Sequence, residues 1–259
     1  MNKTGISYLD FSWNPIVGCS PASGRGCDNC WAKAMARRLA ANPSISDADR
    51  ACYQIAVDHW NGDGMPAFFP DRLHEPSRRK KPAVIGVGFM SDLWHPRVPS
   101  SVRMKILGEI ASCPHHRFVV TTKRSSEIGL NADEVIPANL LVGVSVSGGP
   151  DLWRVDELCE NTRDTVLRWI SLEPQVNDVV ALNLTGIDWV VQGCESGPGR
   201  RPFDIQWAQS VRDQCVRSGV WYYLKQMPVN GKVMVHPPLD FERWTQVPSL
   251  LKGDDDATL

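Results

Sequence analysis

Three cysteines near the start of the sequence lie close enough together to bind a metal. Seven residues separate Cys19 from Cys27, and two separate Cys27 from Cys30. The glycines, serines and proline of the first gap are typical of a loop that wraps around a ligand. Cys30 falls in the first turn of an expected helix, where the helix N-terminus favours a thiolate. Three thiolates can hold three irons of a [4Fe–4S] cluster and leave the fourth iron open to an external ligand.

Two alternatives to a cluster follow from the same spacing. One is a zinc site with a fourth ligand elsewhere, although the sequence has no second C-x2-C or H-x3-H pair. The other is three unligated cysteines. The remaining five cysteines are isolated, and each is expected to be a small buried hydrophobe. They are Cys52, Cys113, Cys159, Cys194 and Cys215.

Six apolar runs predict the strands that position these residues. The runs cover residues 83–89, 118–122, 140–146, 166–172, 189–193 and 220–224. Because they are continuously apolar rather than alternating, they indicate strands buried on both faces, and the spacers between them suit βα crossovers. The runs therefore predict an α/β fold with a parallel sheet. Helices are expected at residues 28–41, 47–60, 100–113, 152–160 and 205–218.

The length of 259 residues and the pattern of elements are interpreted as one domain over residues 1–250. Residues 42–81 break the βα rhythm and are expected to be an insertion after the first βα unit. Residues 251–259, with three consecutive aspartates, are expected to be a disordered tail. The N-terminus lacks a secretory signal and no apolar run approaches the ~20 residues of a membrane span, so we expect a cytoplasmic protein with no membrane partner.

Polar residues follow all six apolar runs. In a parallel β/α barrel, ligand-binding groups gather at the carboxyl ends of strands, so these residues predict one shared site. Each of them alone is also compatible with a solvated loop residue or a helix cap. The residues that follow the runs, all of them polar except Met90, are Met90, Ser91, Asp92, Lys123, Arg124, Ser145, Ser147, Glu173, Glu195, Ser196, Lys225 and Gln226.

The net charge of −1 and the pI of about 6.6 argue against a protein that coats nucleic acid through bulk charge. A local basic patch is still present at Arg78, Arg79, Lys80 and Lys81. This patch is either a solvated loop or a short binding edge.

Several motifs together resemble a known family. They are residues 7–19 (SYLDFSWNPIVGC), Cys27-Asp28-Asn29-Cys30 with Trp31, and residues 90–93, 122–124, 143–145, 172–174, 195–198 and 224–226. Over about residues 4–235 the chain is similar to the three-cysteine phage family often labelled a domain of unknown function, which is related to radical S-adenosylmethionine (SAM) enzymes, with spore photoproduct lyase among its closer cousins. The usual C-x3-C-x2-C spacing of that superfamily is widened here in its first gap, a departure that the phage family shares.

The resemblance implies a partial parallel (β/α) barrel of the radical SAM type with about six or seven strands. It implies a [4Fe–4S] cluster on Cys19, Cys27 and Cys30, and S-adenosylmethionine bound with the help of Ser91, Lys123, Ser145 and Glu173. Glu195 and Asp92 are the candidate catalytic residues. The implied reaction isomerises or modifies a thymine or another base of phage DNA in a bacterial host, with an electron donor such as flavodoxin or ferredoxin. A zinc-binding, non-catalytic nucleic-acid module is the alternative function.

Overall fold

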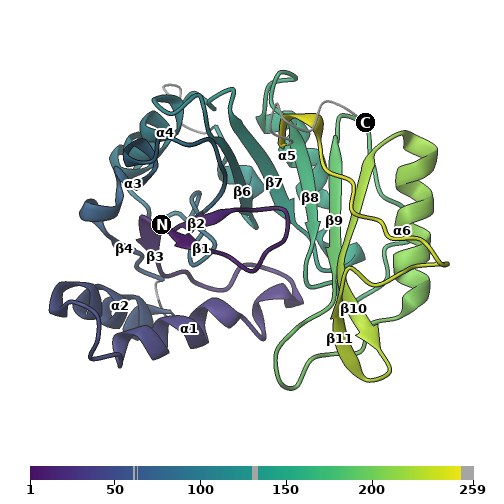
Figure 1. The fold of residues 1–259 in the computed structure, drawn as a ribbon, viewed down its shortest axis with the longest axis horizontal. Coiled ribbons are helices and arrows are strands. Elements are labelled where there is room, and N and C mark those ends of the chain that lie inside the picture. Colours follow the sequence, from purple (N-terminus) through teal and green to yellow (C-terminus); the bar gives the residue numbers. More distant parts are fainter. Residues whose placement is uncertain (61, 63, 130–133, 252–259) are drawn as a thin grey trace. The chain divides into compact units, whose positions relative to one another are not determined.

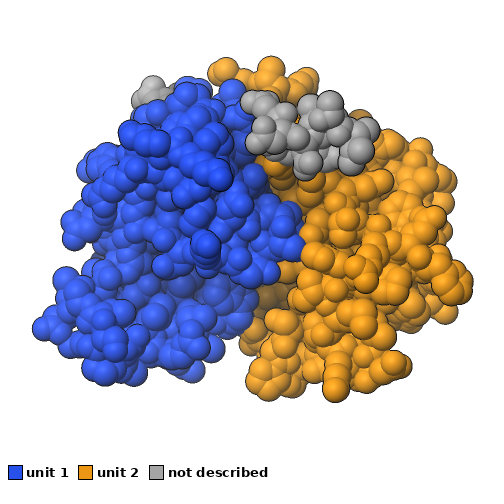
Figure 2. All heavy atoms as spheres, in the orientation of Figure 1, with its two compact units in different colours: residues 1–22, 30–141 blue, residues 23–29, 142–259 orange. Residues whose placement is uncertain are grey.

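The computed structural model describes residues 1–60, 62, 64–129 and 134–251, so the expected disordered tail falls outside the described residues except for Leu251. The chain divides into two compact units (Figure 2). Unit 1 comprises Met1–Ala22 and Cys30–Leu141, and unit 2 comprises Ser23–Asn29 and Val142–Leu259. Each unit is described by itself, and the expectation of one domain stays a prediction.

Unit 1 contains a mostly parallel sheet in the order β1, β2, β5, β6. Strands β1, β2 and β6 are labelled in Figure 1. Strand β2 (Phe11–Trp13) is parallel to β5 (Val84–Val87), and β5 is parallel to β6 (Arg117–Thr122), while β1 (Asn2–Lys3) is antiparallel to β2. Ile85 and Phe118 are fully buried in this sheet, as continuously apolar strands require. A separate antiparallel pair joins β3 (Ile16–Val17) to β4 (Ala67–Phe68).

The described residues of unit 1 also form four α-helices and two short 3-10 helices. They are α1 (Trp31–Ala40), α2 (Asp47–His59), α3 (Glu75–Arg78), α4 (Ser100–Ala111), η2 (Pro70–Arg72) and η3 (Ser125–Glu127). Helices α1 and α2 share a small core with Val17, Trp60 and Phe69. Ser46 caps α2 by accepting a hydrogen bond from the Asp49 N–H. The expected insertion over residues 42–81 therefore packs against the helix that follows the cysteines.

Unit 2 contains the strand series β7, β8, β9, β10, β11. Strand β7 (Leu140–Ser145) begins with the last two residues of unit 1 and continues in unit 2, parallel to β8 (Arg168–Leu172). Strands β9 (Trp189–Gly193) and β10 (Trp221–Val229) continue the parallel series, and β11 (Lys232–Val235) adds an antiparallel edge. The helices are α5 (Trp153–Asn161), α6 (Ile205–Ser218), η1 (Arg25–Cys27), η4 (Gly149–Asp151) and η5 (Ser249–Leu251).

All six predicted strands and all five predicted helices are present, so the α/β class with largely parallel strands is confirmed. Strands β1–β4 and β11 and helix α3 were not expected from the sequence. Within the described residues, the strand pairings of each unit run from one edge to another and do not close on themselves. A partial barrel therefore stays a prediction. A search of the described residues finds no helix with the length and apolar character that a membrane crossing requires.

Candidate metal and cofactor site

Cys19 follows β3 through a glycine that the local packing requires. Gly18 has a φ of 108°, and a Cβ atom there would lie 3.1 Å from the Cβ of Ala56 and 3.2 Å from the backbone of Pro66. Its N–H donates to the Met90 carbonyl at 3.0 Å, so the start of the cysteine loop (residues 18–30) is fastened to the turn after β5. Gly18 therefore fixes the point at which Cys19 leaves the sheet.

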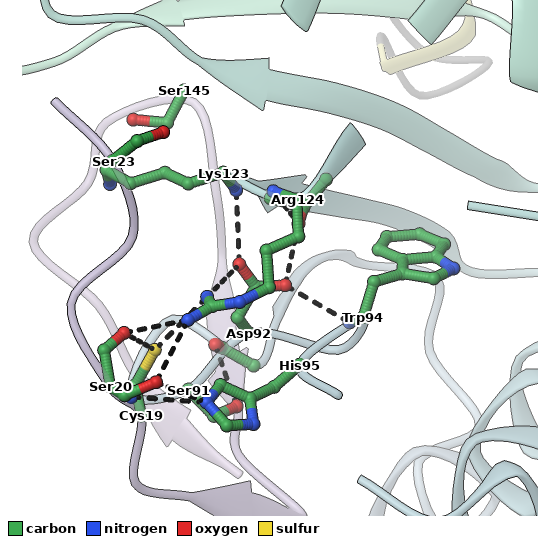
Figure 3. A network of polar contacts seen from close by, with 12 residues as sticks. Cys19, Ser20, Ser23, Ser91, Asp92, Trp94, His95, Lys123, Arg124 and Ser145 are labelled. Atoms are coloured by element: carbon green, nitrogen blue, oxygen red, sulfur yellow. Dashed lines mark hydrogen bonds and ion pairs between the residues drawn. The ribbon is translucent and has the colours of Figure 1, made fainter. Parts of the chain in front are cut away.

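A buried ion pair lies beside Cys19 in unit 1 (Figure 3). Asp92 is 5% exposed, and its carboxylate accepts hydrogen bonds from Thr122 Oγ1 at 2.6 Å and from the backbone N–H groups of Trp94 and Lys123 at 3.1 Å. Arg124 Nη1 donates to the same carboxylate at 3.1 Å and lies 3.6 Å from Cys19 Sγ. All four donors belong to unit 1, so the Asp92 carboxylate is held by residues of its own unit.

Arg124 also holds the backbone of the cysteine loop. Its Nη2 donates to the Ser20 carbonyl at 2.8 Å and to Ser20 Oγ at 3.2 Å. Burial alone would lower the pKa of Arg124, but the charges of Asp92 and Cys19 outweigh burial and raise that pKa. Arg124 is therefore a permanent cation next to Cys19, and a neighbouring cation favours a thiolate.

His95 bonds the same serine from the other side (Figure 3). The Arg97 backbone N–H lies 3.1 Å from His95 Nδ1. On the other side of the ring, Nε2 lies 2.8 Å from Ser20 Oγ and 3.3 Å from the Ser20 backbone nitrogen. Ser20 is thus held by one histidine and one arginine.

Cys30 is the N-cap residue of α1 and makes no side-chain capping hydrogen bond. Cys27 is the last residue of η1 in unit 2. Both thiols are partly exposed, and the described part of the chain offers neither of them a hydrogen-bond partner. None of the eight cysteines forms a disulfide. Among the described residues, no three His, Cys, Asp or Glu side chains form a group that could hold a metal ion. The three cysteines are divided between the two units.

Two of the residues expected to bind S-adenosylmethionine belong to unit 1. Ser91 lies in the turn after β5, where its Oγ donates to the Gly88 carbonyl at 3.1 Å and its backbone bridges to Gly18. Lys123 follows β6 and is partly exposed, and its ammonium has no hydrogen-bond or ion-pair partner in the described part of the chain. Lys123 therefore presents an uncommitted positive charge.

The other two belong to unit 2. Ser145 ends β7, and its Oγ approaches the Glu173 carbonyl at 3.5 Å. Glu173 pairs with Lys225 Nζ, whose distances to Oε1 and Oε2 are 3.0 and 3.2 Å. A Cβ atom on Gly193 would lie 2.8 Å from Glu173 Oε1, so the glycine at the end of β9 leaves room for this carboxylate between β8 and β10. Glu173 is thus already neutralised by a lysine.

Glu195, a candidate catalytic residue, follows β9 and is 8% exposed. Its carboxylate accepts from the Arg201 backbone N–H at 2.8 Å, from Arg201 Nε at 3.1 Å and from Asn29 Nδ2 at 3.2 Å. Burial alone would raise the pKa of Glu195, but these hydrogen bonds lower it below its ordinary value. Glu195 is thus paired with Arg201 within unit 2, and its catalytic role stays a prediction.

The isolated cysteines divide into two groups. Cys113, Cys194 and Cys215 are buried, as expected. Burial raises the pKa of Cys194 to about 11 and that of Cys215 to about 12, so neither thiol ionises at neutral pH. Cys52 and Cys159 are partly exposed, which departs from the expectation of burial.

Sequence analysis missed the residues that hold the cysteine loop. Arg124 was one of several strand-end residues without a specific role, and Ser20, His95 and Arg154 were not identified. Arg154 in α5 is completely buried, with bonds to backbone carbonyl groups. Only its position on the otherwise apolar face of a short helix distinguishes it from a solvated arginine.

Comparison with known proteins gives one result at the level of the family. A search of curated proteins and of solved structures returned no match. One family model, described as a protein of unknown function (DUF5131), matches residues 3–245. The match includes the cysteine loop and every strand from β2 to β11, and the chain therefore belongs to the DUF5131 family.

Proposed function

We propose that this chain binds a [4Fe–4S] cluster through Cys19, Cys27 and Cys30 and acts as a radical SAM enzyme on a nucleic-acid base. The single observation that carries the proposal is the cysteine triplet in a loop that leads into the N-terminus of α1. Cys27 and Cys30 are three residues apart, so the chain itself limits their Cα separation to about 11 Å. None of the three donors forms a disulfide.

The surroundings of the individual cysteines fit thiolate ligands. Arg124 lies 3.6 Å from Cys19 Sγ, and a cation at that distance stabilises the negative thiolate. Cys30 is the N-cap of α1, whose free N–H groups carry partial positive charge, and Cys30 Sγ makes no hydrogen bond to a described residue. A thiol buried among apolar residues, such as Cys215, would resist the same ionisation.

When bound and reduced, such a cluster would supply the electron that cleaves S-adenosylmethionine to methionine and a 5′-deoxyadenosyl radical. The uncommitted Lys123 ammonium would bind the carboxylate of the methionyl group. Ser91 and Ser145 would offer hydroxyl groups to the amino group or the ribose. Glu173 would contribute to S-adenosylmethionine binding together with its ion-pair partner Lys225. Asp92 would position Lys123 by accepting a hydrogen bond from the Lys123 backbone N–H.

A basic hollow in unit 1 supports a nucleic-acid substrate. A cavity of about 530 Å³ is lined by Met1, Phe11, Glu75 and the four basic residues at 78–81. Its one carboxylate, Glu75, pairs with the N-terminal ammonium, and none of the four basic residues forms an ion pair with a described carboxylate. Four cations without a carboxylate partner favour a phosphate-bearing partner. If that partner is duplex DNA, the reacting base would have to be flipped out of the helix. We further propose that the substrate is a modified base of phage DNA and that a flavodoxin or ferredoxin donates the electron. The proposal also includes a partial barrel fold and a cytoplasmic location.

Metal analysis tests the proposal directly. Protein purified without oxygen should contain iron and acid-labile sulfide and absorb near ~400 nm, where thiolate-to-iron charge transfer occurs. Incubation of the reduced protein with S-adenosylmethionine should release 5′-deoxyadenosine. Stoichiometric zinc without iron would refute the cluster and leave the zinc-binding module as the function.

A further inference from the structure

The segment Ser23–Asn29, which carries Cys27, has almost no apolar side chain with which to hold its conformation. Its sequence is SGRGCDN, and η1 within it contains no buried residue. Both flanking parts of the chain belong to unit 1, whereas this segment belongs to unit 2. Its conformation therefore depends on polar contacts with the rest of unit 2.

Arg154 holds the beginning of the segment. This completely buried side chain donates through Nη2 to the Ser23 carbonyl at 2.5 Å and to Ser23 Oγ at 3.1 Å, and through Nη1 to the Ser145 carbonyl at 2.8 Å. Asp151 lies 3.3 Å from Nη1 and balances the charge. Gly24 has a φ of 84°, and a Cβ atom there would collide with Asp151 Oδ1 at 2.1 Å.

Arg201 holds the end of the segment. Its Nη1 donates to the Arg25 carbonyl at 3.0 Å and to Asp28 Oδ2 at 3.1 Å. Its Nε donates to Glu195, and the Glu195 carboxylate in turn accepts from Asn29 Nδ2. One guanidinium group therefore joins a backbone carbonyl and an aspartate of the segment to a buried carboxylate outside it.

We propose that Arg201, oriented by Glu195, positions Cys27 for metal binding, which makes Glu195 a positioning residue. We call the contacts of Arg201 with Glu195, the Arg25 carbonyl and Asp28 the clamp. All of its residues belong to unit 2, and only its role toward the metal rests on the proposed function. The loss of Arg201 leaves Glu195 buried without its cation and removes the side-chain hydrogen bond to the Arg25 carbonyl, which keeps the 3.3 Å hydrogen bond from the Asp28 N–H. Cys27 lies between the two contact points of Arg201 on the segment, Arg25 and Asp28, so its backbone becomes less restrained.

Trypsin cleavage tests the clamp without any metal, because the Arg25 carbonyl that Arg201 bonds belongs to the scissile Arg25–Gly26 peptide. In the full-length protein, Arg201→Ala should speed this cleavage by about 10- to 100-fold, the range that loss of charged hydrogen bonds gives when proteolysis follows local opening. Arg212→Ala is the matched control. Arg212 is also in unit 2, is equally buried and pairs with Asp213 and Asp240, but it does not contact the segment.

The two variants should leave the far-UV circular dichroism unchanged, which separates local opening from misfolding. Arg201→Lys should restore little protection, because an ammonium group cannot reproduce the fork of contacts. Glu195→Gln should also accelerate cleavage, by less than Arg201→Ala, because the Arg201 bonds to Arg25 and Asp28 survive. Equal cleavage rates in Arg201→Ala and Arg212→Ala would overturn the clamp, and unchanged cleavage in Glu195→Gln would overturn the positioning role of Glu195.

Iron release then connects the clamp to the metal. A chelator should remove iron from reconstituted Arg201→Ala about tenfold faster than from the unchanged protein or Arg212→Ala. If the unchanged protein binds no iron, the proposed function fails while the cleavage result still decides the clamp. Faster cleavage together with unchanged iron release would overturn the role of Arg201 toward Cys27.

Discussion

Replacing Asp92 by Asn should destabilise unit 1, because this carboxylate satisfies four donors at once. Oδ1 accepts from Thr122 Oγ1 and the Trp94 N–H, and Oδ2 accepts from the Lys123 N–H and Arg124 Nη1. An amide has one accepting oxygen, so it can serve one of these pairs while its NH2 group faces the other. Both partners of the ion pair are nearly buried, with side chains 6% and 12% exposed for Asp92 and Arg124.

The expected loss in the free energy of unfolding is about 2–4 kcal/mol, from one hydrogen bond to a cation, one to a neutral donor and the uncompensated charge of Arg124. Urea unfolding followed by circular dichroism measures it. Asp47→Asn is the control, because Asp47 also pairs with an arginine but is 91% exposed, and such a pair contributes about 0–1 kcal/mol. Arg124→Gln added to Asp92→Asn should recover part of the loss, because the unpaired cation is removed.

Equal stability of Asp92→Asn and Asp47→Asn would refute this reasoning. It would mean that the four hydrogen bonds to Asp92 contribute no more to the free energy of unfolding than the exposed Asp47–Arg50 pair does. A loss of 5′-deoxyadenosine formation without a loss of stability would then favour the catalytic role of Asp92 instead.

Four further predictions concern the metal, the cofactor, the substrate and pH. Alanine at any of Cys19, Cys27 or Cys30 should abolish iron binding, whereas Cys52→Ala should leave the iron content unchanged; full iron retention in Cys27→Ala would contradict the cluster. Lys123→Ala should weaken S-adenosylmethionine binding by about 1.5–3 kcal/mol in calorimetry while the iron content stays constant, and unchanged affinity would make Lys123 a solvated residue. Binding to unmodified duplex DNA should be weak, with a log–log salt slope that corresponds to about four phosphate contacts or fewer, and alanines at the four basic residues should flatten it. The pKa of Glu195 is lower in the folded state than its ordinary value of 4.5. The stability that this carboxylate contributes is therefore present above pH 4.5 and is lost as the pH falls through the folded pKa. Between neutral pH and about pH 3, the Glu195→Gln variant should lose less stability than the unchanged protein.

The strands and helices were predictable because burial leaves a strong pattern in the sequence. Strands buried on both faces are continuously apolar, as in residues 140–145 and 189–193, and each of them was found where the pattern placed it. Strands β1 to β4 have only two or three residues each, and β11 is an exposed edge strand. Such strands are fixed by their partners rather than by their own side chains, so no pattern indicated them.

The sequence indicated which residue types the candidate site contains but not which of them form ion pairs with one another. The strand-end rule selected Asp92, Glu173 and Glu195, because a polar residue directly after an apolar run is visible in one sequence. It could not show that each of these carboxylates already has a cation. Arg124 is 32 residues from Asp92 and Lys225 is 52 residues from Glu173. Such pairings depend on which strands are neighbours, and a single sequence does not contain that information.

The arginines are better explained by the cysteine loop than by the carboxylates alone. A Gly- and Ser-rich loop pairs few of its peptide carbonyls in regular secondary structure, so side chains or water supply many of the donors. Within unit 1, Arg124 donates to the Ser20 carbonyl; within unit 2, Arg154 donates to that of Ser23 and Arg201 to that of Arg25. Each guanidinium also contacts a carboxylate, namely Asp92, Asp151 or Glu195, which fixes its orientation. A lysine has one nitrogen and cannot bond a carbonyl and a carboxylate with the same planar geometry. The loop that carries the cysteines is therefore held by three arginine–carboxylate pairs through its backbone. The Cys27 and Cys30 thiols make no hydrogen bond to a described residue, whereas Cys19 Sγ donates to the Ser20 carbonyl at 3.2 Å and accepts from Arg124.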